Sequence, residues 1–252
     1  MDQELLKAAT SNFNLPHDMV QLPTGGVFYK NKKKSIKVGY LTANDENILS
    51  NALQNNTQSM ILNLLRNKIY EHDLKPEEMM DTDVEAVLIF LRNTSFGPEY
   101  KVTLVDPKTN KRFESSISLD ELNIIPGKIN PDSNGCFETT LPKTGDVVKL
   151  KPLTFGDLLE LENRENSYPK GREVPKITWR LEKQIQEVNG NSDKGFISTY
   201  VVSLPIMDSK HIRNFLNENI PSLDLKKSVI TPSGEEVIAN ITFGVEFFRI
   251  FF

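Results

Sequence analysis

The stretch that decides the fold is Val148-Lys149-Leu150-Lys151-Pro152-Leu153-Thr154-Phe155-Gly156-Asp157, because the chain carries a second version of it. The second version is Ile36-Lys37-Val38-Gly39-Tyr40-Leu41-Thr42-Ala43-Asn44-Asp45. In both, a short apolar strand leads to a Thr that is followed three residues later by an Asp, the reciprocal pattern of a capping box. We therefore predict that Thr42 with Asp45, and Thr154 with Asp157, cap two equivalent helices.

A shared turn precedes each version and extends the repeat. Leu22-Pro23-Thr24-Gly25 stands before the first version, and Leu141-Pro142-Lys143-Thr144-Gly145 stands before the second. A further hairpin is predicted late in each half, with turns at residues 106–110 and 231–234. The sequence therefore predicts an α+β fold of two related halves, each with short β-hairpins packed on several α-helices.

The boundary between the halves is predicted at a stretch rich in Pro, Gly, Asn and Ser. The expected organisation is an N-terminal arm at residues 1–21, a first hairpin-helices-hairpin half at 22–125, a linker at 126–140, and a second such half at 141–252. The second half ends in an aromatic C-terminal tail.

Hydrophobic spacing predicts the individual elements. The strands expected to form hairpins are 27–29 with 36–40, 100–105 with 112–119, and 228–230 with 237–241. Besides the helix that begins at Thr154, helices are expected over 42–53, 60–69, 84–91, 175–188, 196–204 and 208–216.

Composition argues against several classes of function. The 252 residues carry a net charge of −4, so no global positive field favours nucleic acid as a ligand. Cys136 is the single cysteine, which excludes an internal disulfide and any site built of several thiolates. The chain opens without the features of a signal peptide, and no apolar stretch is long enough to span a membrane. We expect a cytoplasmic chain whose partners are proteins, with neither nucleic acid nor a membrane among them.

No group of residues predicts catalysis, a cofactor or a metal site. The three histidines have no second ligand at metal spacing, and phosphate loops, dinucleotide motifs and nucleophile elbows are absent from the sequence. We expect no catalytic residue, no cofactor, no metal ligand and no small-molecule substrate.

Two clusters of charge leave alternatives from other classes. Carboxylate pairs at Glu77-Glu78, Asp81/Asp83 and Glu160/Glu162 could serve a cell-wall-degrading enzyme, although helix caps and solvated faces explain them better. A basic cluster could bind phosphates, although a solvated turn explains it better; its members are Lys30, Lys32, Lys33, Lys34 and Lys37.

The aromatic tail is the feature that this search leaves over. Chain ends are normally polar, whereas the last ten residues include Phe243, Phe247, Phe248, Phe251 and Phe252. Either these rings close the core of the second half, or they project as protein-binding anchors, since aromatic residues dominate core and interface energetics alike. The two roles can coexist.

Three short motifs carry a resemblance to a known family. They are Leu22-Pro23 with Gly25 and Tyr29, the unit from Ile36-Lys37-Val38 to Leu41-Thr42 and Asp45-Glu46, and the closing Ile241-Thr242-Phe243-Gly244 with Phe247-Phe248 and Phe251-Phe252. In these motifs the chain resembles the baseplate hub and tail-assembly protein family of contractile-tailed, T-even-like bacteriophages.

The resemblance implies a non-enzymatic phage baseplate hub protein that acts in tail and baseplate assembly through protein–protein contacts. The alternative role that it implies is an assembly chaperone for the hub or the tape measure, absent from the mature virion. Its partners would be other baseplate hub or tail proteins, the tape measure included. Its location would be the virion tail baseplate, or the host cytoplasm during assembly.

Overall fold

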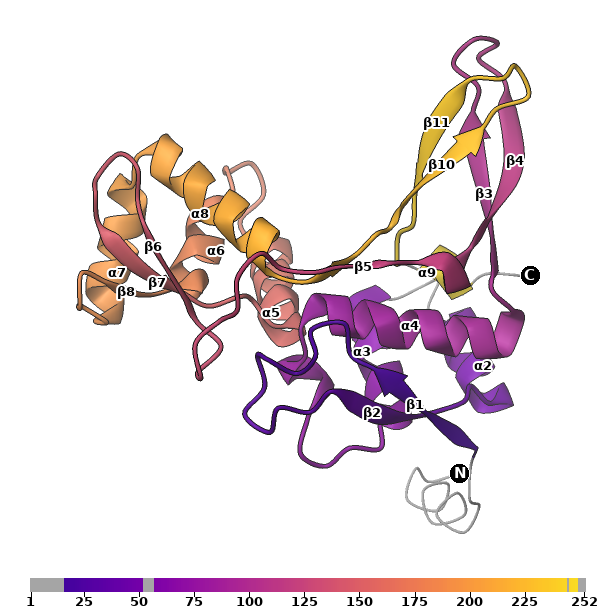
Figure 1. Cartoon of the computed structure of the whole chain (residues 1–252), viewed down its shortest axis with the longest axis horizontal. Helices are drawn as coiled ribbons and strands as arrows, with labels where there is room; N and C mark the ends of the chain where they lie inside the picture. The colour runs from indigo at the N-terminus through magenta and orange to yellow at the C-terminus, as the bar shows by residue number, and fades with distance from the viewer. Residues whose placement is uncertain (1–15, 52–56, 244, 249–252) are drawn as a thin grey trace.

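The computed structural model describes residues 16–51, 57–243 and 245–248, and it combines helices with small antiparallel sheets (Figure 1). This confirms the predicted α+β class. The predicted arm up to residue 15, the end of the helix predicted over 42–53, and the tail residues Phe251 and Phe252 lie outside the described residues.

The chain from residue 17 to residue 125 contains two strands, three helices, a hairpin and a short edge strand. In order they are β1 (His17–Gln21), β2 (Ser35–Gly39), α2 (Ala43–Asn51), α3 (Thr57–Lys68), the 3-10 helix η2 (Pro76–Glu78), α4 (Asp81–Phe96), β3 (Glu99–Val105), β4 (Arg112–Ser118), the 3-10 helix η3 (Leu119–Glu121) and β5 (Ile124–Ile125).

The chain from residue 137 onward has a similar order of elements. They are β6 (Phe137–Thr140), β7 (Val147–Leu150), α5 (Phe155–Asn166), α6 (Lys176–Gln184), β8 (Ile185–Val188), α7 (Lys194–Ser203), α8 (Ile206–Asn219), β9 (Ser222–Leu223), β10 (Lys226–Ile230), β11 (Glu236–Asn240) and the short α9 (Val245–Phe248).

The first hairpin differs from the prediction. β2 pairs with β1, which lies inside the predicted arm, so the strand expected at 27–29 is wrong. Gly25 and Gly26 have φ values of 60° and 76°, a left-handed conformation that bends the chain before residue 27. The Tyr29 hydroxyl then donates to the buried carboxylate of Asp83. Residues 27–29 therefore form part of a turn that is held against α4.

The helix expected over 175–188 ends early. Residues 185–188 form β8, which pairs with β7 in a three-stranded sheet of order β6-β7-β8. Val148 lies opposite Val188 and Leu150 lies opposite Ile185, with a register shift between Lys149 and Leu150. A bulge of this kind adds one residue to a strand. It lets Ile185 and Val188, three residues apart, both be buried, and this spacing is what had suggested a helix.

The buried apolar residues form two cores. The second core is built from residues 137 to 216, contributed by β6, β7, β8 and the helices around them. The first core contains β1, β2, α3 and α4, and it also takes in Val229, Ala239, Ile241, Phe247 and Phe248. The final hairpin and α9 therefore pack in the first core, although they belong to the second half of the sequence.

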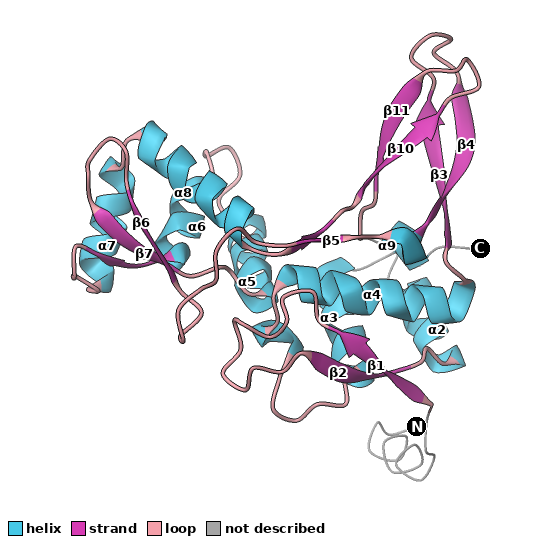
Figure 2. Ribbon diagram, in the orientation of Figure 1, coloured by secondary structure: helices cyan, strands magenta, loops and turns pink. Residues whose placement is uncertain are grey.

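The hairpins β3-β4 and β10-β11 lie side by side and project from the body as one arm (Figure 2). We call these four strands the hairpin arm. Their inward side chains join the first core, and the Ser233 hydroxyl at one tip donates to Asp106 Oδ1 at the other tip at 2.8 Å. Burial acts to raise the pKa of Asp106, but hydrogen bonds from Ser233 and from the amides of Lys108 and Thr109 hold it below its usual value.

The repeated turns are each held by a buried aspartate on a later helix. Thr24 donates to Asp83 through its amide at 2.9 Å and through its hydroxyl at 2.5 Å. In the second half, the amides of Lys143 and Thr144 donate to Asp208 at 2.7 and 3.0 Å. Asp83 and Asp208 are both fully buried, and each is the third residue of its helix. The two halves therefore share a long-range contact that local sequence similarity did not reveal.

The starts of α2 and α5 are held by similar contacts, each through an aspartate that pairs with a threonine and a lysine. Thr154 and Asp157 form a reciprocal capping box, and Lys183 Nζ lies 3.0 Å from Asp157 Oδ1. Asp45 accepts from the Thr42 amide at 2.7 Å and forms a buried ion pair with Lys68. Burial acts to raise the pKa of Asp157, but the bonds from Thr154 and Lys183 hold it below its usual value. Thr154 and Asp157 therefore cap α5, and the hydrogen bond from Thr42 to Asp45 holds the start of α2.

Candidate protein-binding surfaces

The tail residues that the structure describes are used within the chain. The Phe247 ring is fully buried and the Phe248 ring nearly so, in contact with each other at a centroid distance of 5.2 Å. Phe243 is half-buried and packs on Phe247 at 4.8 Å. The core that these rings close is the first one, whereas the sequence suggested the core of the second half.

A buried arginine holds the tail in place. Arg92 of α4 donates to the backbone oxygens of Phe247, Gly97 and Glu99 at 3.1, 2.8 and 2.9 Å. Its guanidinium carbon lies 5.2 Å from the ring centre of Tyr100 and 5.7 Å from that of Phe247, within range of a cation–π contact. Burial lowers the pKa of Arg92. The role of Arg92 could not be predicted from the sequence, because Phe247 lies 155 positions away from it along the chain.

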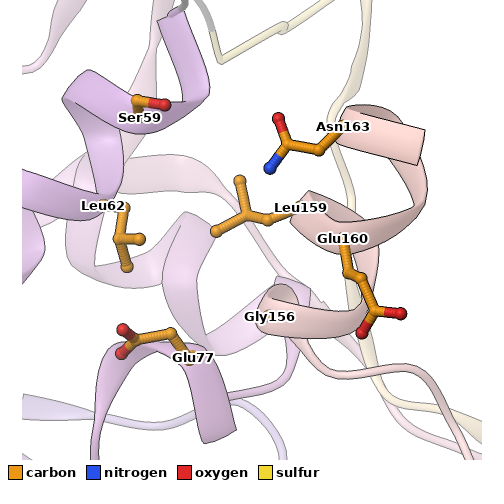
Figure 3. Close-up of a pocket in the computed structure, with 7 residues that line it drawn as sticks. All are labelled: Ser59, Leu62, Glu77, Gly156, Leu159, Glu160 and Asn163. Atoms are coloured by element: carbon orange, nitrogen blue, oxygen red, sulfur yellow. The ribbon is translucent and has the colours of Figure 1, made fainter. Parts of the chain in front are cut away.

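One pocket, of about 320 Å³, lies between α3, η2 and α5. Leu62 and Leu159 point toward each other across it, whereas the Glu160 carboxylate turns away from them (Figure 3). Both acids of the lining are paired: Arg66 Nε donates to Glu77 at 2.9 Å and Lys183 Nζ donates to Glu160 at 2.8 Å. The pocket therefore presents no free carboxylate pair of the kind that glycoside hydrolysis uses.

The carboxylates of α4 lie outside this pocket and have separate roles. Asp83 is buried and accepts three hydrogen bonds, from Thr24 and Tyr29, and burial raises its pKa. Burial together with the charge of Asp81 raises the pKa of the half-buried Glu85 to about 8. Asp81 itself is exposed, at the first residue of α4, next to the contact of Met79 and Met80 with the start of α5.

Two lysines of the basic cluster make contacts within the chain. Lys33 forms ion pairs with Glu71 and Asp73, and Lys32 Nζ donates to the backbone oxygen of Val27 at 2.8 Å. The ion pairs of Lys33 reduce the positive charge of this turn, which favours the solvated-turn interpretation over a phosphate-binding patch.

Exposed apolar side chains mark two other places on the surface. On the hairpin arm, Ile230 and Ile238 point outward on neighbouring strands, and Val105 is exposed beside the tip of β3. At the junction of α7 and α8, Val202, Ile206 and Met207 expose 74%, 85% and 61% of their surface. Exposed apolar groups gathered at one place are typical of protein–protein contact sites.

The described residues contain no cluster of three or more His, Cys, Asp or Glu side chains that could hold a metal ion. Among the helices of residues 16–51, 57–243 and 245–248, none has both the length and the apolar character needed to cross a bilayer.

A family model described as "T4 bacteriophage base plate protein" matches residues 24–249, which is nearly the whole chain. The chain belongs to the T4 bacteriophage base plate protein family. The match confirms the resemblance found in the three sequence motifs. No curated protein and no solved structure is significantly similar to it.

Membership of the base plate family gives the protein its broad role. It is a phage baseplate protein, its place is the virion tail, and its partners are other baseplate or tail proteins. Its exposed apolar groups on the arm and at the α7–α8 junction suit such contacts.

Proposed function

We propose that the protein is a non-enzymatic baseplate hub subunit that acts in tail and baseplate assembly through protein–protein contacts. The observation that carries the proposal is the exposure of Ile230 and Ile238 on an arm that projects from the body (Figure 2). An arm of two packed hairpins joined at their tips can reach a neighbouring subunit without any rearrangement of the cores.

The docking residues that we propose differ from those first suggested by the sequence. The rings of Phe247 and Phe248 are buried in the first core, so the contact surface is assigned to the outward face of the arm. A protein-binding role for Phe243, Phe251 and Phe252 stays a prediction.

The proposal is tested on phage particles and on purified tail proteins. Mass spectrometry with chemical cross-linking of purified particles is expected to find the protein in the tail and linked through the arm to another baseplate protein. Absence from mature particles, with binding to hub or tape-measure proteins only during assembly, would reject the hub-subunit role in favour of the assembly chaperone.

A pair of variants tests the arm itself. Ile238→Asp places a charge in the centre of the exposed face and is expected to weaken binding to the cross-linked partner by at least about tenfold. Ile177→Asp is the matched control, because Ile177 is similarly exposed but lies on α6, away from the arm. Equal binding by wild type and Ile238→Asp would remove the arm from the interface.

A further inference from the structure

The contact between the two halves of the chain joins two different pieces of the repeat. The start of α5 packs against the segment that precedes α4: the Phe155 amide donates to the Met79 oxygen at 2.7 Å, and Thr154 pairs with Met80 in an antiparallel bridge. Met79, Met80 and Phe155 are all buried. The first half thus offers a receiving segment, and the second half fills it with a capped helix start.

The repeat supplies a second receiving segment. Asp83 and Asp208 occupy the same helix position and hold equivalent turns, so Met79–Met80 correspond to 204–205, and Asp81–Thr82 correspond to Ile206–Met207. In the second half this segment stands at the surface, with Val202, Ile206 and Met207 as its most exposed apolar residues. We call these three residues the α7–α8 face.

The repeat also supplies a second helix start. Thr42-Ala43-Asn44 correspond to Thr154-Phe155-Gly156, and Ala43 and Asn44 are exposed. The α7–α8 face and the start of α2 lie near opposite ends of the long axis of the molecule (Figure 1). One molecule therefore cannot bring its own pair together, whereas two molecules can.

The side chains around the two contacts differ. Inside the chain, the large Phe155 is placed beside a segment that continues into the polar residues Asp81 and Thr82. In the unused pair, the helix start carries the small Ala43, while the receiving segment carries the large apolar residues Ile206 and Met207. The contact inside the chain thus buries Phe155 beside Met79 and Met80, and the unused pair offers Val202, Ile206 and Met207 as apolar surface for burial.

We propose that the α7–α8 face of one molecule binds the start of α2 of a second copy, in the way that the 79–82 segment binds the start of α5 within the chain. Because the two surfaces differ, the contact is heterologous and leaves a free surface of each kind at the ends of the pair. Copies of the protein then associate head to tail. The inference concerns only the protein's contact with itself, so it does not depend on the proposed hub role.

Two variants block the two surfaces separately. Ile206→Asp combined with Met207→Thr gives the second half the residues found in the first half, at exposed positions in the first turn of α8 where an acid is favourable. Ala43→Asp places a charge at the other surface, likewise in a first helical turn. Sedimentation velocity of the wild-type chain at rising concentration should show self-association, and each variant should lower the association constant at least about tenfold.

Mixing the two blocked variants is the decisive measurement. Each variant keeps one intact surface, and the two intact surfaces are complementary, so the mixture should form a one-to-one dimer while each variant alone stays monomeric. Ile230→Asp is the control, since it removes a similarly exposed apolar side chain from the arm and should associate like wild type. If Ala43→Asp lowers the thermal midpoint, the exposed Asn44→Arg blocks the same end in its place.

Four results would overturn the proposal. The first three are a wild-type chain that stays monomeric up to its solubility limit, blocked variants that associate as the wild type does, and a mixture of two folded variants that stays monomeric. A dimer abolished by Ile206→Asp with Met207→Thr but untouched by both α2 substitutions would show an isologous contact instead, and would overturn it as well.

Discussion

Replacing Phe247 by alanine tests whether the aromatic tail is part of the core. The ring is fully buried against Tyr100, Phe243 and Phe248, with ring centroids 5.5, 4.8 and 5.2 Å away. A buried aromatic side chain covers about 200 Å², which at about 25 cal/mol per Å² corresponds to about 5 kcal/mol. Truncations of buried Phe to Ala cost about 3–5 kcal/mol. We therefore expect Phe247→Ala to lower the free energy of unfolding by about 4 kcal/mol.

The assay is urea unfolding of the purified chain followed by two signals. Far-UV circular dichroism reports on all helices, whereas the fluorescence of Trp179, the single tryptophan, reports on the second half, where it packs against Tyr168 and Arg164. Because Phe247 belongs to the first core, the circular dichroism transition should move to lower urea more than the fluorescence transition does.

A matched phenylalanine provides the control for this experiment. Phe196 on α7 is 41% exposed and lies outside both buried cores, so Phe196→Ala should cost only about 1 kcal/mol. A loss of less than about 1 kcal/mol for Phe247→Ala would contradict the core assignment and return Phe247 to the candidate protein-binding residues.

Three further substitutions test other parts of the fold. Asp83→Ala leaves buried donors without an acceptor and should cost about 3–5 kcal/mol by urea unfolding, and Asp208→Ala should cost a similar amount if the halves are equivalent. Burial raises the pKa of Glu85 to about 8, so the wild type loses stability as pH rises between 4.5 and 8. Glu85→Gln should therefore leave the free energy of unfolding unchanged at about pH 5 and raise it by about 1–2 kcal/mol at about pH 9. Gly156→Ala should destabilise the contact between the halves by about 1–3 kcal/mol, because its Cβ would lie 2.7 Å from a backbone oxygen of η2; Gly195→Ala, whose Cβ would meet nothing closer than 3.3 Å, should be neutral or stabilising.

Local chemistry allowed much of the fold to be predicted. The Thr and Asp capping pairs, the turns at 106–110 and 231–234, and the positions of α3, α4, α7 and α8 all depend on neighbouring residues, and the structure has them where the sequence placed them. The strand at 17–21 was missed because its single buried apolar residue, Val20, gives no alternating pattern; the strand exists because β2 pairs with it.

The contacts that determine which residues are buried and which are exposed could not be predicted, because they join distant parts of the chain. Asp83 and Asp208 look like ordinary acids in a first helical turn until the structure brings the turns at Thr24 and Thr144 to them. The sequence left open whether the tail closes the core of the second half or projects as a protein-binding anchor, whereas Arg92 and the arm hold Phe247 in the first core. No local pattern encodes where the final hairpin packs.

The pattern of agreement and divergence between the halves itself bears on assembly. The contacts that build each half, through Asp83 and Asp208 and through the capping aspartates, are similar. The joining surfaces differ, because the second half has Phe155 where the first has Ala43, and Ile206-Met207 where the first has Asp81-Thr82. Two identical pairs of surfaces would let a neighbouring molecule compete with the chain's own second half for the first receiving segment. Specificity is a difference of affinities, and unlike surfaces supply it by penalising the wrong pairing. Asp81 within the first receiving segment and the bulky Phe155 in its in-chain partner distinguish the contact within one molecule from the contact between molecules. Each chain can therefore fold as a unit and still leave one defined surface at each end.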